Sequence, residues 1–242
     1  MEAIRIQDLT KKYKDLTAVN KMNLSIKQGE LFSLLGVNGA GKSTTLKMLS
    51  CLSKPTSGDA FLMGKSIVKE PGEAKALLGI SPQETAVAPR LSVKENLELM
   101  CGAHGFSKAK TREKTEEITK AFHLEDISGK KACRLSGGWQ RRLSIAMALI
   151  GEPKILFLDE PTLGLDILAR NELWDFIRRL KGRITVILTT HYMEEAEQLS
   201  DRIAIMKDGK IIALGSPEEL KIKAGTKQFD EAFVKLIKEA EI

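Results

Sequence analysis

The sequence of 242 residues has no long apolar run. No stretch approaches the ~18 consecutive apolar residues that a membrane-spanning helix needs. The first ten residues alternate polar and apolar side chains and lack the apolar block of a signal peptide. These absences predict a chain that folds in the cytosol and does not itself cross a membrane.

Cysteine and aromatic residues are also scarce. Cys51, Cys101 and Cys133 are far apart, and no C-x-x-C pair indicates a metal or redox motif. We therefore expect buried or half-buried thiols. Because aromatic residues make up only 5% of the chain, Tyr13 is conspicuous in the polar stretch TKKYKD, which reads as a turn. An exposed tyrosine there is a candidate for stacking on a flat ring, and a tyrosine that caps an edge of the core is the alternative.

The overall composition is that of an ordinary soluble protein. The chain is 43% hydrophobic and 29% charged, and its length allows one large domain or a core domain with a subdomain. The net charge of +6 fits work near phosphates, acidic lipid or nucleic acid, but it does not choose among them. We find no internal repeat and no low-complexity tail.

The most informative stretch is LFSLLGVNGAGKSTTLKML, residues 31–49. An apolar run predicts a buried strand, the pattern G-x-x-x-x-G-K-[ST] follows it, and helical spacing then begins. Glycines let the backbone N–H groups approach an anion, and the start of a helix directs further unpaired N–H groups toward it. Lys42 would reach the β- and γ-phosphates of a nucleoside triphosphate, and the Ser43 hydroxyl would ligate Mg²⁺. The predicted loop comprises Gly36, Val37, Asn38, Gly39, Ala40, Gly41, Lys42, Ser43 and Thr44.

Strands and helices alternate along most of the chain, which predicts an α/β fold with a mostly parallel sheet. The early strands predict an additional antiparallel portion. We expect an ATP-binding core from residues 1–83 and 151–220, an inserted α-helical subdomain from 84–150, and a helical extension from 221–242. Strands are predicted over residues 3–9, 18–26, 31–35, 59–63, 76–80, 154–158, 183–188, 202–206 and 210–214.

A second glycine loop lies far from the first. In LSGGWQRR, residues 135–142, Ser136 and two glycines directly precede a predicted helix. This arrangement is a second anion-binding nest. Because one nucleotide needs only one nest, the second indicates that each nucleotide lies between two chains arranged head to tail. A plain glycine-rich helix N-cap is the alternative.

Polar side chains follow the later apolar strands. Residues 154–158 end in Asp159 and Glu160, where the aspartate would hold the Mg²⁺ shell and the glutamate would polarise a water for attack on the γ-phosphate. His191 ends another apolar strand and could donate a hydrogen bond to the γ-phosphate, although a satisfied edge histidine is the alternative. Gln83, in a Pro-Gln turn, is a weaker candidate by itself.

Six motifs in this order, GVNGAGKST, SPQ, LSGGWQRR, ILFLDEPT, LGLD and TTHYMEEAE, resemble the ATP-binding cassette (ABC) ATPases from the first strand to about Glu219. The resemblance implies ATP and Mg²⁺ as cofactors. It implies that the loop 36–44 is the Walker A motif and that Asp159 and Glu160 are the Walker B aspartate and the catalytic glutamate. The resemblance further implies that Tyr13 stacks on adenine, that Gln83 is the Q-loop glutamine, which also serves the catalytic metal, and that His191 is the switch histidine. It implies a D-loop aspartate at Asp166. It also implies a signature motif that caps the partner's ATP and consists of Ser136, Gly137, Gly138 and Gln140.

Two positions depart from the family pattern. Trp139 stands where the signature more often has a polar residue, and Leu163 stands where the D-loop usually has a small one. Neither replaces a group expected to touch phosphate.

The resemblance implies a subunit that hydrolyses ATP for a separate integral membrane permease, paired with a second ATPase chain that we expect to be identical. The wording of TTHYMEEAE is similar to the exporter branch for drugs, lipids, polysaccharides or peptides. Such a subunit would be cytoplasmic and held at the inner face of the membrane by the permease. The alternative is a soluble ABC ATPase acting on ribosomes or nucleic acid, although the chain has one cassette and no sustained heptads. A GTP switch or small-molecule kinase shares the first loop but has no use for the second, and no N-K-x-D signal follows. We expect no nucleic-acid partner.

Overall fold

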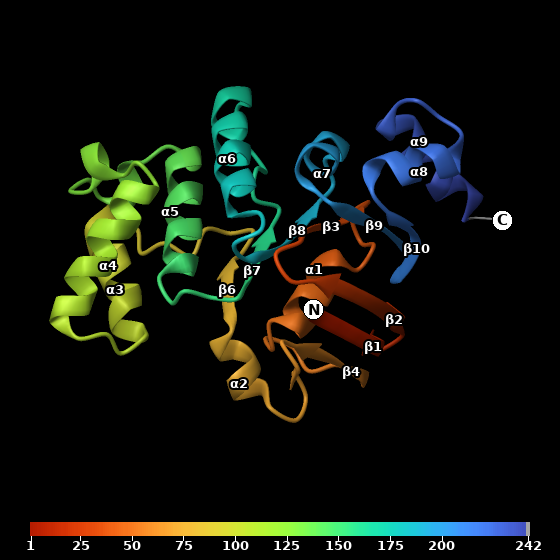
Figure 1. The fold of residues 1–242 in the computed structure, drawn as a ribbon, viewed down its shortest axis with the longest axis horizontal. Helices are drawn as coiled ribbons and strands as arrows, with labels where there is room; N and C mark the ends of the chain where they lie inside the picture. Colours follow the sequence, from red (N-terminus) through yellow and green to blue (C-terminus); the bar gives the residue numbers. More distant parts are fainter. Residues whose placement is uncertain (241–242) are drawn as a thin grey trace.

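The computed structural model describes residues 1–240, which form two β-sheets surrounded by helices (Figure 1). The strands are β1 (Glu2–Tyr13), β2 (Leu16–Lys27), β3 (Leu31–Gly36), β4 (Ser57–Leu62), β5 (Lys65–Ser66), β6 (Leu78–Ser81), β7 (Ile155–Asp159), β8 (Thr185–Thr190), β9 (Arg202–Lys207) and β10 (Lys210–Gly215). The helices are α1 (Lys42–Leu49), α2 (Pro71–Ala76), α3 (Val93–Ala103), α4 (Lys108–Ala121), α5 (Gly137–Leu149), α6 (Ile167–Leu180), α7 (Met193–Leu199), α8 (Pro217–Ala224) and α9 (Phe229–Glu239), with short 3-10 turns at Glu125–Ile127 and Ala132–Arg134.

The larger sheet is mostly parallel and the smaller one is antiparallel. The 6-stranded sheet has the order β10-β9-β3-β8-β7-β6, in which only the outer strand β10 is antiparallel to its neighbour. The 4-stranded sheet has the order β2-β1-β4-β5 and is antiparallel throughout. The predicted α/β fold with a mostly parallel sheet and an antiparallel portion is confirmed.

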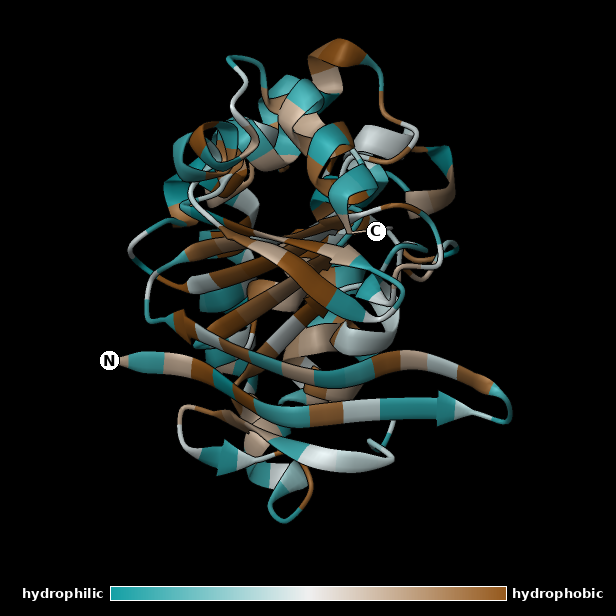
Figure 2. Ribbon diagram, turned by 90° about the vertical axis from the view of Figure 1, so that its right-hand side faces the viewer, coloured by the Kyte–Doolittle hydropathy of each residue, from teal (hydrophilic) through white to brown (hydrophobic). Residues whose placement is uncertain are grey.

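The central parallel strands are buried on both faces, which explains why their sequences are continuously apolar. In β7, Leu156 and Leu158 pack into one cluster with side chains of α3, α5 and α6. Ile155 and Phe157 point to the other face, where they pack with α1 and the 4-stranded sheet. Figure 2 shows these strands as the hydrophobic middle layer of the molecule. The helix α1, which follows the glycine loop, is therefore held between the two sheets.

Helices α3 and α4 lie at one end of the molecule and α8 and α9 at the other (Figure 1). The capping box predicted at the start of α3 is present, because the Ser92 hydroxyl accepts from Glu95 N at 3.2 Å and Ser92 N donates to the Glu95 carboxylate at 2.7 Å. Helices α3, α4 and α5 all fall within the expected subdomain of residues 84–150. The division into core, helical subdomain and extension stays a prediction.

The structure differs from the expected elements in three places. Strand β1 continues to Tyr13 because its last residues still pair with the start of β2, so the tyrosine ends a strand instead of lying in a turn. Helix α2 was not predicted, since Pro71 and Gly72 read as a loop, yet Pro71 occupies the first turn, where it costs no hydrogen bond. Cys133 is exposed, whereas Cys101 is buried and Cys51 is half-buried as expected.

Within residues 1–240, no helix combines the length and the apolar character that crossing a bilayer requires.

Helix α5 packs closely against the sheet at Gly79 of β6. A β-carbon there would overlap the carbonyl oxygen of Ala148 and lie 2.9 Å from Cγ of Pro153. We expect Gly79→Ala to lower the free energy of unfolding by about 1–3 kcal/mol, because α5 has to move away from the sheet. Urea denaturation followed by circular dichroism measures this.

The matched control is Gly72→Ala in α2, where an added β-carbon meets nothing within 4 Å. This change should leave stability unchanged or raise it by up to ~1 kcal/mol, since alanine favours a helix over glycine. Equal unfolding midpoints for Gly79→Ala and the wild type would show that the close approach does not constrain the packing.

Candidate functional site

The glycine loop, Gln83, Glu160 and His191 gather at one edge of the 6-stranded sheet because each follows the carboxyl end of a parallel strand. Strand registers place Leu35 beside Thr190 and Thr189 beside Asp159, so β3, β8 and β7 end at the same level. Strand β6 ends one strand further along the sheet, just before Gln83. The carboxyl edge of such a sheet is where α/β proteins bind ligands.

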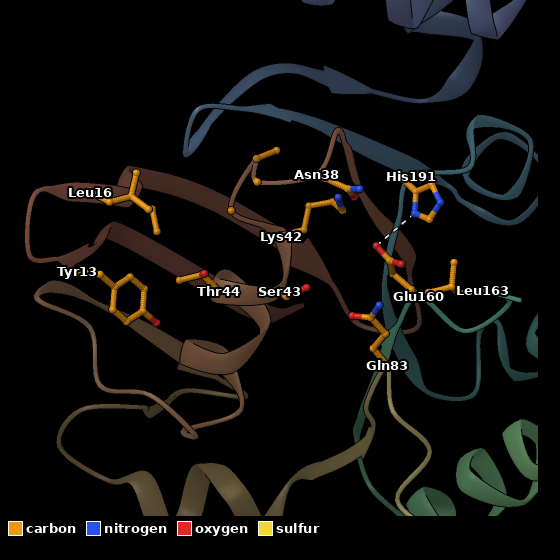
Figure 3. A pocket seen from close by; sticks show the side chains of 14 residues that line it. Tyr13, Leu16, Asn38, Lys42, Ser43, Thr44, Gln83, Glu160, Leu163 and His191 are labelled. Atoms are coloured by element: carbon orange, nitrogen blue, oxygen red, sulfur yellow. Dashed lines mark ion pairs between the residues drawn. The ribbon is translucent and has the colours of Figure 1, made fainter.

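A cavity of about 560 Å³ opens at this edge (Figure 3). In Figure 3 Lys42 and Ser43 lie in its middle, Tyr13 at one end, and Gln83, Glu160 and His191 at the other. The cavity thus joins residues that are more than a hundred positions apart in the chain. It is lined by Tyr13, Leu16, Ala18, Asn38, Gly39, Ala40, Gly41, Lys42, Ser43, Thr44, Gln83, Glu160, Leu163 and His191.

The glycine loop has the conformation that its sequence requires. Gly39 and Gly41 have φ angles of +83° and +103°, in the region that residues with a β-carbon avoid. Gly36 packs so closely on β9 that a β-carbon would lie 2.5 Å from Met206 O. Helix α1 begins directly after Gly41, and its first N–H groups face the loop. The loop therefore forms an anion-binding nest at a helix N-terminus.

Lys42 points back over this loop. Its Nζ donates to Gly36 O at 2.7 Å and to Val37 O at 3.2 Å. Burial lowers the pKa of Lys42, and the carboxylates of Glu160 and Asp159 oppose that effect. The ammonium group thus has only neutral carbonyl partners at hydrogen-bonding distance, and phosphate oxygens would pair with it more strongly.

Asp159 and Glu160 face this loop from the end of β7. Ser43 Oγ donates to Asp159 Oδ1 at 3.2 Å, and the Thr189 hydroxyl donates to the same oxygen. The backbone of Glu160 is in the left-handed region, with φ 47°, which is strained for a residue with a side chain. Its N–H donates to Thr189 O at 3.0 Å and bonds the Thr189 hydroxyl at 3.2 Å. Neighbouring β8 therefore fixes both acidic residues.

His191 is brought beside Glu160, as the predicted roles of these two residues require. The distance from His191 Nδ1 to Glu160 Oε1 is 3.2 Å, drawn as the dashed line in Figure 3, but the two groups lack the alignment of a hydrogen bond. Nδ1 is buried without a hydrogen-bond partner, which favours the role toward phosphate over a satisfied edge histidine, and that role stays a prediction. This nitrogen is free to bond a group that enters the cavity.

Arg141 belongs to the site although the sequence did not single it out. It is buried, and it donates to Pro82 O at 2.6 Å and to Gln83 O at 2.5 Å. Burial lowers the pKa of Arg141, and the nearby carboxylates of Asp159, Glu195 and Glu160 oppose that effect. The guanidinium therefore fixes the backbone of the Gln83 turn. Only the fold distinguishes it from its neighbour Arg142, which pairs with Glu172 at the surface.

Tyr13 is 45% exposed and stands at the outer end of the cavity. The Lys11 ammonium lies 5.1 Å from the centre of its ring. Leu16 and Ala18 on the adjacent β2 line the same end, and sequence reasoning missed both because apolar residues of a strand carry no motif. Together they offer an aromatic face and an apolar floor, which suit a flat ring. Stacking by Tyr13 stays a prediction.

The second glycine loop lies outside this cavity. Ser136 is the N-cap of α5 without a capping hydrogen bond from its side chain. A β-carbon on Gly138 would come within 3.1 Å of Ala169 Cβ, so α5 and α6 pack closely there. Gln140 Nε2 donates to the carbonyls of Ala132 and Leu135, both at 3.2 Å. The roles predicted for Ser136, Gly137, Gly138 and Gln140 toward a partner's nucleotide stay predictions.

Asp166 and Trp139 contact other residues of the chain, and Leu163 lines the cavity. Asp166 caps α6, accepting from Ala169 N at 2.9 Å, so its predicted role toward nucleotide stays untested. The Trp139 ring lies 4.6 Å from the Arg142 guanidinium, and Leu163 lines the nucleotide-sized cavity.

The residues present fit a magnesium ion. Ser43 and Asp159 bring two hard oxygen ligands to one point, and the Thr189 hydroxyl orients the carboxylate. Among residues 1–240 no group of three or more His, Cys, Asp or Glu side chains is arranged to hold a metal. Mg²⁺ is usually held by one or two carboxylates together with substrate phosphates.

A phosphate-binding nest, a lysine over it and an aspartate and a glutamate at the end of β7 define a P-loop nucleotide-binding protein of the ATPase class. Comparisons with known proteins agree. A family model described as ABC transporter matches residues 19–163, more than half of the chain. A second, described as an AAA domain of a putative AbiEii toxin from a Type IV toxin–antitoxin system, matches residues 132–195. The chain belongs to the ABC transporter family, as an ATPase cassette.

Two bacterial relatives show the extent of the likeness. The chain is 41% identical over 241 residues to the probable multidrug ABC transporter ATP-binding protein YbhF of Escherichia coli (strain K12), covering 97% of this chain and 41% of YbhF. It is 40% identical over 225 residues to the daunorubicin/doxorubicin resistance ATP-binding protein DrrA of Streptomyces peucetius, covering 93% of this chain and 68% of DrrA. The chain thus spans well under half the length of YbhF.

Solved structures share the fold. The ATP-binding subunit of an ABC transporter has a TM-score of 0.86 at 27% identity, covering 97% of this chain and 99% of that one. A dimeric ATP-binding cassette in a post-hydrolysis state, bound to ADP and Pi, has a TM-score of 0.79 at 30% identity, covering 88% of this chain and 98% of that one. The fold is therefore that of the ABC ATPases.

Alanine substitutions at two glycines of the loop, Gly41 and Gly39, test its geometry. A β-carbon on Gly41 would overlap the carbonyl oxygen of Ala18, whereas one on Gly39 would meet nothing within 4 Å. Both residues have positive φ angles, so the backbone strain is shared and only the overlap differs. We expect Gly41→Ala to weaken ATP binding by about tenfold or more relative to Gly39→Ala, a difference of roughly 1.4 kcal/mol or more in binding free energy.

Equilibrium titration with a fluorescent ATP analogue measures the two affinities, and thermal unfolding verifies that both variants are folded. If both variants bind equally well, the contact between the loop and β2 does not shape the phosphate site.

Proposed function

We propose that this chain is the ATP-hydrolysing, nucleotide-binding subunit of an ABC transporter. In this proposal two copies dimerise around two ATP molecules and power transport, most simply export, through a separate integral membrane permease. The observation that carries it is the single cavity that joins the glycine loop, Gln83, Glu160 and His191, with the second glycine loop outside it.

The nucleotide would lie along the cavity. Its ring would rest on Tyr13 between Leu16 and Ala18, and its phosphates would lie in the nest of residues 36–44. Lys42 would then exchange its carbonyl partners for phosphate oxygens. Mg²⁺ would be held by Ser43, Asp159 and Gln83, and when bound it neutralises charge on the phosphates.

Glu160 is the proposed general base. Its carboxylate faces the cavity between His191 and Leu163, at the end where the outermost phosphate would lie. It would accept a proton from a water that attacks this phosphate, while His191 would donate a hydrogen bond to the phosphate oxygens. The strained backbone of Glu160, held by two hydrogen bonds from its N–H to Thr189, fixes the direction of the carboxylate before nucleotide arrives.

A second chain would complete the site. The cavity is open on one side, and the loop Ser136–Gly138 presents an exposed serine and helix N-terminus with no ligand of its own in the same chain. A copy arranged head to tail would bring this loop to the phosphates. The dimeric cassette with which this chain shares its fold supports such an assembly.

The permease and the direction of transport rest on the relatives. YbhF is named as a multidrug ABC transporter ATP-binding protein, DrrA as a drug-resistance ATP-binding protein, and a relative from Burkholderia orbicola (strain AU 1054) as a Nod factor export ATP-binding protein. These names favour an exporter subunit over a soluble ATPase that acts on ribosomes or nucleic acid. The proposed location is the inner face of the cell membrane, through the permease.

The first test of this function separates binding from chemistry. Glu160→Gln should keep ATP binding and lower turnover by ~10²–10⁴-fold, because the side chain keeps its shape but loses the proton acceptor. Lys42→Ala should weaken both binding and turnover. A phosphate-release assay and a binding titration on each variant measure the two effects. Near-normal hydrolysis by Glu160→Gln would refute the assignment of the base.

The second test concerns assembly. In the Glu160→Gln background, ATP with Mg²⁺ should drive dimerisation, because the sandwich forms and is not hydrolysed. Adding Ser136→Arg should block it, since a bulky cation would occupy the second glycine loop. Sedimentation velocity with and without ATP measures the association state.

The control is Gly129→Arg, which adds the same charge at an exposed position where a β-carbon meets nothing within 4 Å. This variant should still dimerise. Monomers of the Glu160→Gln chain at saturating ATP, or dimers that tolerate Ser136→Arg, would contradict the head-to-tail sandwich.

A further inference from the structure

Three buried polar atoms lack a hydrogen-bond partner within residues 1–240, and all belong to one region. They are Arg170 Nε, His191 Nδ1 and Glu195 Oε2. The three residues lie on α6, on the loop that ends β8, and on α7. Buried polar atoms without partners are rare in folded proteins. These atoms gather near the end of the cavity that Glu160 and His191 line, which indicates that the region has a role besides packing.

Glu195 is the centre of this region. Its side chain is fully buried, and its Oε1 accepts from Thr162 Oγ1 at 2.8 Å and from Trp174 Nε1 at 3.1 Å. Burial raises the pKa of Glu195, and the hydrogen bonds from Thr162 and Trp174 oppose that effect. Its neighbour Ala196 and Leu199 in the same helix are buried and apolar. An apolar side chain would therefore suit the packing of α7 better than a carboxylate, whose burial is costly.

One donor to Glu195 comes from the turn that carries Glu160. Thr162 lies two residues after Glu160, in the turn closed by the bond from Leu163 N to Glu160 O at 3.2 Å. Glu195 itself lies on α7, which begins two residues after His191. The bond from Thr162 to Glu195 thus joins the turn of Glu160 to the helix that follows His191.

We propose that Glu195 is a positioning residue that sets the placement of Glu160 relative to His191 through its bond to Thr162. This inference rests on the ATPase function proposed above. Glu160 needs such support because its left-handed backbone is strained and because no hydrogen bond joins its carboxylate to His191. Trp174 fixes Glu195 in turn from α6.

Loss of the bond between Thr162 and Glu195 should lower the rate of catalysis and leave nucleotide binding unchanged. Glu195 does not line the cavity, and its hydrogen bonds go to Thr162 and Trp174, which lie outside the phosphate nest of residues 36–44. Releasing Thr162 should therefore leave nucleotide affinity unchanged while it displaces Glu160. A misplacement of about 1 Å in a catalytic group costs on the order of 10²-fold in rate.

The experiment uses Thr162→Val in the full chain, which removes one hydroxyl donor and keeps the shape of a buried side chain. We expect kcat to fall by about 10- to 100-fold while the dissociation constant for ATP stays within about twofold. The control is Glu194→Gln, which changes the neighbouring, largely exposed glutamate of α7 and should leave kcat unchanged. An unchanged kcat in Thr162→Val, or an equal loss in Glu194→Gln, overturns the proposal.

A double-mutant cycle with His191→Ala separates positioning from general structural damage. Single-turnover rates with excess enzyme extend the measurement to slow variants. If Thr162 acts through the catalytic pair, Thr162→Val should slow the His191→Ala chain by no more than about threefold, because effects of groups that act as a unit are not additive. Full additivity overturns the proposal, because it marks a loss that is independent of His191.

Variants of Glu195 itself complete the test. Glu195→Gln keeps an oxygen that accepts from Thr162 and Trp174, so it should retain most of the wild-type rate, whereas Glu195→Leu should behave like Thr162→Val or worse. Equal rates for the two variants overturn the proposal. A wild-type chain that does not hydrolyse ATP would instead refute the proposed function and, with it, this inference.

Discussion

The parallel register of the central strands is the constraint on which the site depends. Strands β3, β7 and β8 end at one level because their backbone hydrogen bonds align Leu35 with Thr190 and Asp159 with Thr189. The glycine loop, Glu160 and His191 follow these ends directly. A slip of one residue in any strand would reverse which side chains face the helices and would carry a catalytic residue out of the cavity.

Lys42 and Asp159 have hydrogen-bond partners within the chain. Lys42 bonds two loop carbonyls, and Asp159 accepts from Ser43 and Thr189. These bonds hold the loop in place, which would reduce the ordering cost of binding a nucleotide. Phosphate oxygens would replace neutral carbonyls around an ammonium group whose pKa burial already lowers. The gain in charge-assisted bonding would then favour the triphosphate over uncharged ligands.

Sequence reasoning found the parts of the site that local patterns encode. The glycine loop, the carboxylates after β7 and the capping box of α3 each depend on residues within a few positions, so their spacing is readable. Arg141, Glu195, Leu16 and Ala18 were missed because their roles depend on tertiary contacts. Helix α2 was missed because proline and glycine read as a loop, and the end of β1 because polar residues hid its pairing with β2.

The contacts of Arg141 and Gly79 connect the second glycine loop to the nucleotide cavity. Arg141 lies on the helix that follows this loop, and its guanidinium bonds the carbonyls of Pro82 and Gln83. At Gly79 the same helix packs against β6 with no room for a β-carbon. Separating α5 from the Gln83 turn would leave a buried guanidinium and two carbonyls unpaired, at a cost of several kcal/mol. The Gln83 turn is therefore held to α5, the helix that begins at the second glycine loop.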